Sequence, residues 1–404
     1  MAVGAEQKID YFPVAGFKLG TTSAGIKTPG RKDLVIMQAQ PGSTMAGVFT
    51  ANAFCAAPVH ICRQHLATQQ PLLMVVNTGN ANAGTGEQGM QDAVSTCAAV
   101  ADLGAVSAAQ VLPFSTGVIG EHLPMPCLLN ALPQAYANLT ENGWSDAAEG
   151  ILTTDTRTKG ASVKLQLSGT EITLTGIAKG SGMIRPNMAT MLAYVATDIG
   201  LSQTMTQELV RDATELSFNR ITVDGDMSTN DSCMLVATGA SGLTVESGTA
   251  DYQALQEALV SLMQTLAQAI VRDGEGASKF IAITVAGGQN RQECLDVAYA
   301  IAHSPLVKTA LFAADPNWGR ILAAVGYAGI TDLDVDNLTI YLGDELLVAN
   351  GGRADSYTEE AGQAVMDKDE ITIRVDLKRG NAKETVWTTD LTYEYVRINA
   401  DYRS

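Results

Sequence analysis

The stretch from Lys179 to Asp198 limits most strongly what this chain can fold into, because it joins a loop directly to a buried strand. Its first half, K-G-S-G-M-I-R-P, carries two glycines and a proline and favours a loop. Its second half, M-L-A-Y-V-A, is mostly apolar and predicts a buried strand. The pair Ala189-Thr190 lies between the halves. We therefore expect a fold that holds a small residue and a hydroxyl residue where a loop enters the core.

This position suits self-cleavage. The Thr190 hydroxyl would attack the Ala189 carbonyl, and hydrolysis of the resulting ester would leave Thr190 as a new N-terminus. A free α-amine has a pKa near neutrality, so it can act as the base that activates the neighbouring hydroxyl. Threonine is also a good strand former, and a structural role for Thr190 is the alternative.

Composition and charge exclude several classes of protein. The 404 residues are 46% hydrophobic and 17% charged, as expected for a globular chain that can form two lobes. The formal net charge of −17 argues against a nucleic-acid surface or an anionic membrane as partner. Without a signal core at the N-terminus, we expect a soluble, cytoplasmic protein. The six scattered cysteines predict buried thiols rather than a disulfide framework.

Several blocks of the sequence together resemble one family. The string K-G-S-G-M-I-R-P-N-M-A-T-M-L resembles the cleavage and nucleophile motif of the ornithine acetyltransferases, the bifunctional glutamate N-acetyltransferases of arginine biosynthesis. The blocks G-V-F-T-A-N-A-F-C-A-A-P-V, R-D-G-E-G-A-S-K-F and D-P-N-W-G-R-I-L-A-A-V-G-Y-A-G are similar to the same family and occur in the same order. The resemblance covers nearly the whole chain and implies a ping-pong transfer of acetyl from N2-acetylornithine to glutamate.

The resemblance also implies roles for single residues. Thr190 would be the nucleophile, with cleavage between Ala189 and Thr190. Thr116 and Gly117 in the block V-L-P-F-S-T-G-V would form the oxyanion hole, where glycine lets the backbone approach a ligand closely. Glu275, between two glycines, would bind the substrate's ammonium group, which wants a fixed carboxylate. The implied substrate-binding residues are Thr153, Lys179, Thr190, Glu275, Asn399 and Ser404.

The expected fold class is α+β with mixed sheets, because two-residue alternation recurs without a strict βαβ rhythm. The resemblance further implies that the fold consists of two packed sheets covered by helices, an αββα sandwich of the N-terminal-nucleophile type. It implies an α fragment, 1–189, and a β fragment, 190–404, which associate as a heterotetramer. We expect no cofactor and no metal, and acetyl-CoA stays open as an alternative donor substrate.

Two other functions stay open. A self-processing amidase or aminopeptidase would use the same nucleophile, with water in place of glutamate. A dinucleotide-dependent oxidoreductase would use the G-x-G-x-x-G formed by Gly84, Gly86 and Gly89. The cluster of Cys55, His60, Cys62 and His65 lacks the paired cysteine spacing of a structural zinc site. If this segment were a strand, His60 and Cys62 would lie on the same face, which side-chain packing alone can explain.

Patterns along the rest of the chain predict its secondary structure. We expect helices around residues 90–100, 203–218, 252–271 and 291–303. We expect strands at 33–39, 45–50, 71–77, 111–120, 279–286, 338–341, 371–377 and 385–395, and a hairpin within 161–177.

Overall fold

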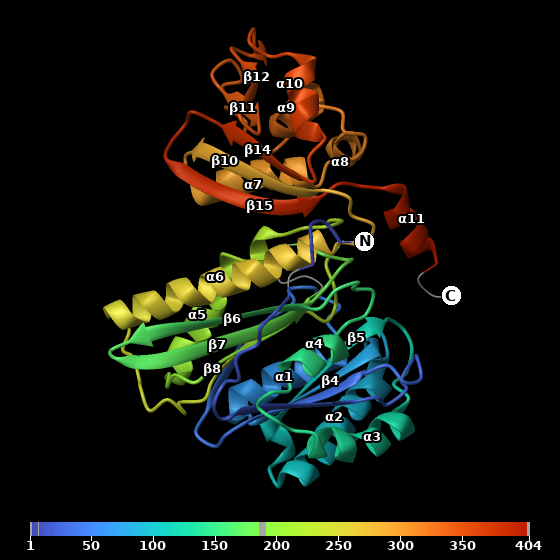
Figure 1. The fold of residues 1–404 in the computed structure, drawn as a ribbon. Helices are drawn as coiled ribbons and strands as arrows, with labels where there is room; N and C mark the ends of the chain where they lie inside the picture. Colours follow the sequence, from blue (N-terminus) through green and yellow to red (C-terminus); the bar gives the residue numbers. More distant parts are fainter. Residues whose placement is uncertain (1, 7, 186–190, 402–404) are drawn as a thin grey trace. The chain divides into compact units, whose positions relative to one another are not determined.

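The computed structural model describes residues 2–6, 8–185 and 191–401. They divide into two compact units (Figure 1). The first, here called the sandwich unit, comprises Gln7–Asn219 and Asp226–Ile270. The second, here called the C-terminal unit, comprises Met1–Glu6, Arg220–Gly225 and Val271–Ser404. This division does not follow the predicted fragments 1–189 and 190–404, since the sandwich unit includes residues from both; the fragments stay a prediction.

Two sheets form the centre of the sandwich unit. The four-stranded sheet has the order β1-β2-β4-β5, and the five-stranded sheet has the order β3-β9-β8-β7-β6. Both are mixed, because β4 pairs with β5 and β8 pairs with β9 in parallel, whereas the other neighbours are antiparallel. The strands are β1 (Phe17–Thr22), β2 (Leu34–Ala39), β3 (Thr44–Phe49), β4 (Leu73–Asn80), β5 (Val111–Val118), β6 (Lys159–Leu167), β7 (Thr170–Lys179), β8 (Leu192–Thr197) and β9 (Ser232–Ala237).

The two sheets pack face to face because their strands carry apolar residues on alternating sides. On β2, Val35 and Met37 belong to the core between the sheets, together with Tyr194 and Ala196 of β8. The intervening Leu34 and Ile36 of β2 instead pack in a second cluster with helix residues. Period-two alternation along one strand thus serves both the sheet–sheet core and the sheet–helix core.

Helices cover the outer faces of both sheets. The four-stranded sheet is covered by residues of α1 (Ala57–Thr68), α2 (Gly86–Gly104) and α3 (Met125–Ala137), while α4 (Trp144–Gly150) packs at its edge. On the five-stranded sheet, α5 (Gln203–Glu215) packs against β3 and β9. Figure 1 shows α6 (Ala250–Arg272) running along β6, β7 and β8. The expected αββα sandwich and α+β class are confirmed.

Helix α6 is long and apolar enough, by length and composition, to cross a membrane. Its Leu262 and Leu266 lie against Gly176 of β7, where a methyl group added to the glycine would stand about 3.1 Å from both. Leu259, Met263 and Ile270 are also buried. The apolar length of α6 therefore serves the packing of a core helix.

The C-terminal unit contains a third sheet, which the sequence patterns did not predict as a separate layer. Its six strands have the order β13-β12-β11-β14-β10-β15, and β10 and β14 are parallel. Buried side chains of α7, α8 and α9 pack on this sheet. The elements are β10 (Phe280–Gly288), α7 (Arg291–Ala302), α8 (Pro305–Phe312), α9 (Trp318–Gly326), β11 (Thr339–Leu342), β12 (Glu345–Ala349), β13 (Gly352–Arg353), α10 (Glu359–Met366), β14 (Glu370–Asp376), β15 (Ala382–Thr389) and α11 (Tyr393–Ala400).

The segment of His60 and Cys62 is helix α1, with a proline in its first turn, so the shared strand face considered for these two residues does not arise. A local prediction at the other end of the chain was wrong: the predicted strand 385–395 ends at Thr389, and Tyr393 begins α11 instead. Thr392 caps this helix, since its side chain accepts a hydrogen bond from the Tyr395 N–H.

Candidate active site

The predicted oxyanion-hole residues lie at the end of β5, where it runs beside β4. Thr116 pairs with Thr78, Gly117 pairs with Gly79, and a bulge follows at Asn80. Gly117 has φ +135°, and a Cβ there would lie 2.3 Å from the Gly79 carbonyl carbon and 2.5 Å from the Asn80 nitrogen. Only glycine fits this contact, so the strand end presents bare backbone beside the Thr116 side chain.

Buried amides hold this strand end in place. The Asn230 amide donates to the Ala81 carbonyl at 2.6 Å and to the Ser115 carbonyl at 2.9 Å. The Ser115 hydroxyl donates to Asn77 Oδ1 at 2.5 Å, and Asn77 Nδ2 donates to the Asn80 carbonyl at 2.9 Å. Asn230 lies just before β9, so these bonds tie the two sheets together next to Thr116. Asn230 is not among the site residues predicted from the sequence.

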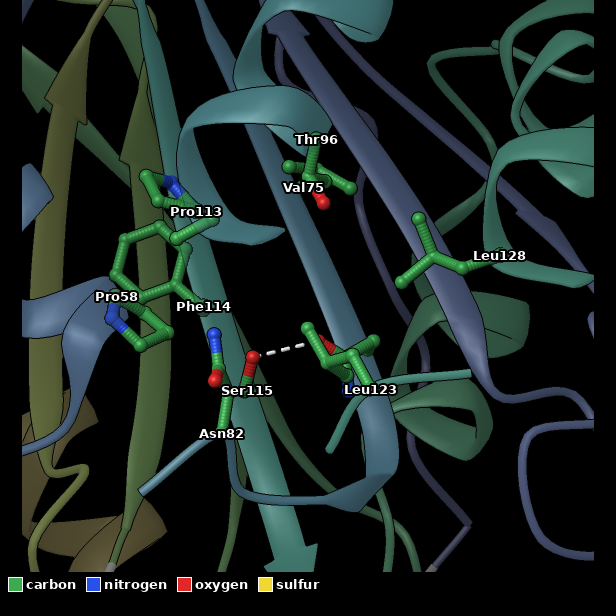
Figure 2. Close-up of a pocket in the computed structure, with 11 residues that line it drawn as sticks. Pro58, Val75, Asn82, Thr96, Pro113, Phe114, Ser115, Leu123 and Leu128 are labelled. Carbon is green, nitrogen blue, oxygen red and sulfur yellow. Dashed lines mark hydrogen bonds between the residues drawn. The ribbon is translucent and has the colours of Figure 1, made fainter. Parts of the chain in front are cut away.

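A small cavity lies beneath the same strand end (Figure 2). Its polar side chains already have protein partners: Ser115 bonds to Asn77, Asn82 Nδ2 donates to the Gly89 carbonyl at 2.9 Å, and the Thr96 hydroxyl donates to the Asp92 carbonyl at 2.8 Å. The other lining residues are mainly apolar, among them Val75, Leu123 and Leu128. The cavity thus belongs to the packing under β5 and holds none of the predicted substrate-binding residues.

Lys179 and Thr153, both predicted to bind substrate, lie together in the sandwich unit. Lys179 Nζ donates to Thr153 Oγ1 at 3.0 Å, although 26 residues separate them. Lys179 ends β7 and is only 4% exposed, so it is not the solvated loop lysine that such a position usually carries. A buried ammonium group with a hydroxyl beside it can hold a carboxylate.

A buried carboxylate, Asp155, organises this pair. Asp155 Oδ1 accepts from Lys159 Nζ at 2.6 Å and from the Gly180 N–H at 2.7 Å, and Oδ2 accepts from the Thr153 N–H at 3.0 Å. Burial alone would raise the pKa of this carboxyl, but the charges of Lys159 and Lys179 and these hydrogen bonds hold the pKa well below its usual range. Asp155 is therefore a permanent anion between two buried lysines.

A second buried acid behaves in the opposite way. Asp231, 1% exposed, accepts a hydrogen bond from the Met191 N–H at 2.9 Å through Oδ1. Burial raises the pKa of Asp231 well above its usual range, although the Met191 N–H and the charge of Lys179 act in the other direction. Met191 directly follows Thr190 in the sequence, so a buried acid fixes the residue next to the predicted cleavage position.

In the C-terminal unit, the predicted residues Glu275 and Asn399 contact each other. Asn399 Nδ2 donates to Glu275 Oε2 at 2.8 Å, and Glu275 is 8% exposed. The neighbouring Gly276 has φ +67°, and a Cβ there would lie 2.4 Å from the Tyr395 nitrogen. The Thr392 hydroxyl also donates to the Gly276 carbonyl at 2.7 Å. The glycine lets the loop of Glu275 approach the start of α11, which carries Asn399.

Three predicted residues, Ala189, Thr190 and Ser404, lie outside the described residues. Their roles stay predictions. The predicted residues that the structure describes fall into two groups in the sandwich unit, Thr116 with Gly117 and Thr153 with Lys179, and one in the C-terminal unit, Glu275 with Asn399.

The comparisons with known proteins decide the family. A model of the ArgJ family matches residues 18–404. The arginine biosynthesis bifunctional protein ArgJ of Pseudomonas fluorescens is 56% identical over 407 residues, covering 100% of both chains. The protein of the same name from Pseudomonas syringae pv. tomato is 57% identical over 406 residues, again covering 100% of both. This chain belongs to the ArgJ family.

One solved ArgJ structure is that of the arginine biosynthesis bifunctional protein from Bacillus halodurans. It is 39% identical to this chain, with a TM-score of 0.48, and the match covers 50% of this chain and 95% of that one. The predicted resemblance to the acetyltransferases of arginine biosynthesis is confirmed by the family model and the two Pseudomonas relatives.

The glycines of the predicted dinucleotide motif have a local structural explanation. The Asn82 amide donates to the Gly89 carbonyl, and the Thr85 hydroxyl donates to Asn82 Oδ1 at 2.8 Å. A Cβ on Gly89 would lie 1.9 Å from Thr85 Oγ1, so the space left by this glycine is filled by the loop's own side chains. In a dinucleotide site, such glycines leave room for a pyrophosphate instead.

Three of the four residues of the cysteine–histidine cluster lie in α1, and their side chains contact different groups. Cys62 Sγ donates to the Pro113 carbonyl at 3.0 Å, and His65 Nδ1 lies 2.7 Å from the Val111 carbonyl. His60 instead lies beside Cys55, with 3.1 Å between Nε2 and Sγ. Within residues 2–6, 8–185 and 191–401, no group of three or more histidine, cysteine or acidic side chains could hold a metal ion.

Proposed function

We propose that this chain is a glutamate N-acetyltransferase that cleaves itself between Ala189 and Thr190 and then moves acetyl from N2-acetylornithine to L-glutamate. The observation that carries this proposal is the match to the ArgJ family over residues 18–404, with relatives of full-length coverage that act in arginine biosynthesis. The pairing of Lys179 with Thr153 and of Glu275 with Asn399 supports it.

In the first half-reaction, the Thr190 hydroxyl attacks the acetyl carbonyl of N2-acetylornithine while its proton passes to the Thr190 α-amine. The negative charge that develops on the carbonyl oxygen is stabilised by donors at Thr116 and Gly117. The tetrahedral intermediate then breaks its C–N bond. The amine returns the proton to the leaving nitrogen, ornithine departs, and the acetyl group stays on Thr190 as an ester.

In the second half-reaction, the amino group of glutamate attacks this ester. The same donors at Thr116 and Gly117 stabilise the oxyanion that forms. The Thr190 oxygen then leaves and regains a proton, and N-acetylglutamate is released. Gly117 suits this task because its bare backbone lies at the strand end beside Thr116.

The Lys179–Thr153 and Glu275–Asn399 pairs suit amino-acid substrates, which carry an α-carboxylate and amines. The Lys179 ammonium and the Thr153 hydroxyl can receive a carboxylate, and the Glu275 carboxylate can receive an ammonium group. Both groups are almost fully buried, and charged hydrogen bonds are strongest where water is excluded.

Family membership also supports finer proposals. The fragments 1–189 and 190–404 stay associated after cleavage, and two such pairs form a heterotetramer. The protein acts in the cytoplasm and needs no cofactor. Acetyl-CoA is a candidate second donor, and a direct assay with acetyl-CoA and glutamate decides whether it is used.

A self-processing amidase is the second candidate, because water could replace glutamate as acceptor. Purified protein incubated with N2-acetylornithine distinguishes the two by its products. Transfer predicts ornithine with N-acetylglutamate in equal amounts, and release of ornithine that depends on glutamate. Ornithine and free acetate formed at the same rate without glutamate would contradict the transferase.

A further inference from the structure

The carboxylate of Asp155 lies at the centre of a buried polar cluster in the sandwich unit. The side chains of Asp155 and Lys159 are 0% and 1% exposed, and 2.6 Å separates Oδ1 from Nζ. Lys159 begins β6 and Lys179 ends β7, and the two strands pair so that Lys159 lies opposite Ala178. Lys159 thus bonds to the carboxylate from β6, and the charge of Lys179, at the end of the adjacent strand, also stabilises its ionised form.

The hydrogen bonds of Asp155 join the two chain segments that carry the predicted substrate pair. One oxygen accepts from the backbone N–H of Thr153 itself at 3.0 Å. The other accepts from the N–H of Gly180, the residue after Lys179, at 2.7 Å. Between these two segments, the Lys179 ammonium group donates a hydrogen bond to the Thr153 hydroxyl at 3.0 Å. One side chain thus sets the spacing of two groups that come from different parts of the chain.

We propose that Asp155 is a positioning residue for acetyl transfer, which fixes the Thr153–Lys179 pair at the spacing that receives the substrate's carboxylate. This inference rests on the proposed function, because it assigns a carboxylate to that pair. Asp155 does not touch substrate; it acts through the two residues that it holds. A misplacement of about 1 Å at a binding group is enough to cost a large factor in rate.

The charges in the cluster support this assignment. The charges of Lys159 and Lys179 help to lower the pKa of Asp155 against its burial, whereas burial raises the pKa of Asp231, the other buried acid that interacts with Lys179. A cluster with two ammonium groups and one permanent carboxylate suits an incoming anion.

The test separates positioning from folding with a pair of variants. Asp155→Asn alone leaves Lys159 buried against a neutral partner, so a loss of stability is expected whatever the residue's role. In Asp155→Asn/Lys159→Met both charges are removed, so no unpaired charge is buried. The hydrogen bonds from the Thr153 and Gly180 N–H groups to residue 155 are still weakened, because the carboxylate is gone. The double variant should fold, with the KM for N2-acetylornithine and for glutamate raised about tenfold or more and kcat changed by less than about threefold.

Two control variants show whether a change in KM is specific to the loss of the Asp155 carboxylate. Lys159→Met alone keeps the backbone bonds of Asp155, so KM should stay within about twofold of wild type. Asp198→Asn removes a carboxylate that accepts from the Thr173 N–H at 2.9 Å beside the opposite end of β7, and it should leave KM unchanged.

The outcomes are distinct. A double variant with a wild-type KM would overturn the proposal, and so would one that fails to fold, because Asp155 would then serve the fold alone. A wild-type protein that transfers no acetyl would overturn the proposed function, and the inference about Asp155 with it.

Discussion

Asn399 Nδ2 donates a hydrogen bond to Glu275 Oε2 across 2.8 Å, although 124 residues separate the two along the chain. This bond connects α11 to the loop after α6, both within the C-terminal unit. It holds the Glu275 carboxylate beside the Asn399 amide at the end of an exposed, polar helix. Both residues are predicted to bind substrate, with Glu275 binding its ammonium group.

Glu275→Gln tests that role. The variant keeps the size of the side chain but removes the charge that would bind ammonium, so kcat/KM for both substrates should fall about 100-fold, about 2.7 kcal/mol. Steady-state kinetics measure this. Glu293→Gln is the matched control, since it disrupts the ion pair of Glu293 Oε1 with Arg379 Nε, 2.9 Å apart, in the same unit. Equal losses in both variants would contradict a binding role for Glu275.

Gly117→Ala tests the end of β5. The added Cβ meets the Gly79 carbonyl carbon at 2.3 Å, so strand β5 must move away from β4. We expect a loss of roughly 3 kcal/mol or more in the free energy of unfolding, together with loss of acetyl transfer. Denaturant unfolding and kcat measure the two effects.

Gly120→Ala is the control for backbone strain alone. Gly120 has φ +86°, and an added Cβ meets nothing within 4 Å. Its cost should be about 1 kcal/mol, with activity retained. If Gly117→Ala proved as mild as Gly120→Ala, the close contact between β4 and β5 would not matter for the site.

Asp231→Asn should be tolerated, and its effect should depend on pH. Burial raises the pKa of Asp231 in the folded state, so between about pH 4 and that raised pKa the folded protein binds more protons than the unfolded chain. Wild-type stability from this group is therefore present at low pH and is lost as pH rises. Asparagine carries no proton to lose and can still accept from the Met191 N–H. The variant should thus gain stability relative to wild type between pH 4 and pH 7, as measured by urea unfolding; a relative loss would show that Asp231 is ionised.

We expect Lys308 to increase the free energy of unfolding as pH rises in the alkaline range. It donates to the Thr388 hydroxyl at 3.1 Å and is buried, and burial lowers its pKa to about 8 despite the opposing charges of Asp390 and Asp224. Between about pH 8 and pH 10.5 the unfolded chain holds the proton that the folded protein has lost, so this group adds stability as pH rises. Relative to Lys308→Met, wild type should gain up to about 3 kcal/mol across this range in denaturant unfolding. A constant difference would contradict the shifted pKa.

The sequence predicted elements better than it predicted how distant elements meet. The strands β2, β3 and β7 and the helices α5 and α6 were expected close to their observed positions, because apolar periodicity is a local signal. Helix α11 was missed because the strand-like alternation of apolar and polar residues in 385–395 extends into its first residues. The signal that could have found it was Thr392 as N-cap, with Glu394 in the first turn.

The burial of Lys179 could not be read from its own neighbourhood. Glycines after it suggested a loop, and a loop lysine is usually solvated. Its burial depends on Thr153 and Asp155, which lie before the β6–β7 hairpin and join Lys179 only when that hairpin folds back. Asp155 was passed over for the same reason, since a lone acid in a polar turn carries no local sign of two lysine partners.

In the proposed reaction, Thr190 is freed by self-cleavage and then carries the acetyl group. The denatured mass of purified protein, before and after incubation with N2-acetylornithine in the absence of glutamate, tests both steps. We expect two fragments that separate between Ala189 and Thr190. Only the fragment that begins at Thr190 should become one acetyl group heavier, and this gain should disappear when glutamate is added. A single chain of 42.4 kDa that still transfers acetyl would contradict the proposed role of Thr190.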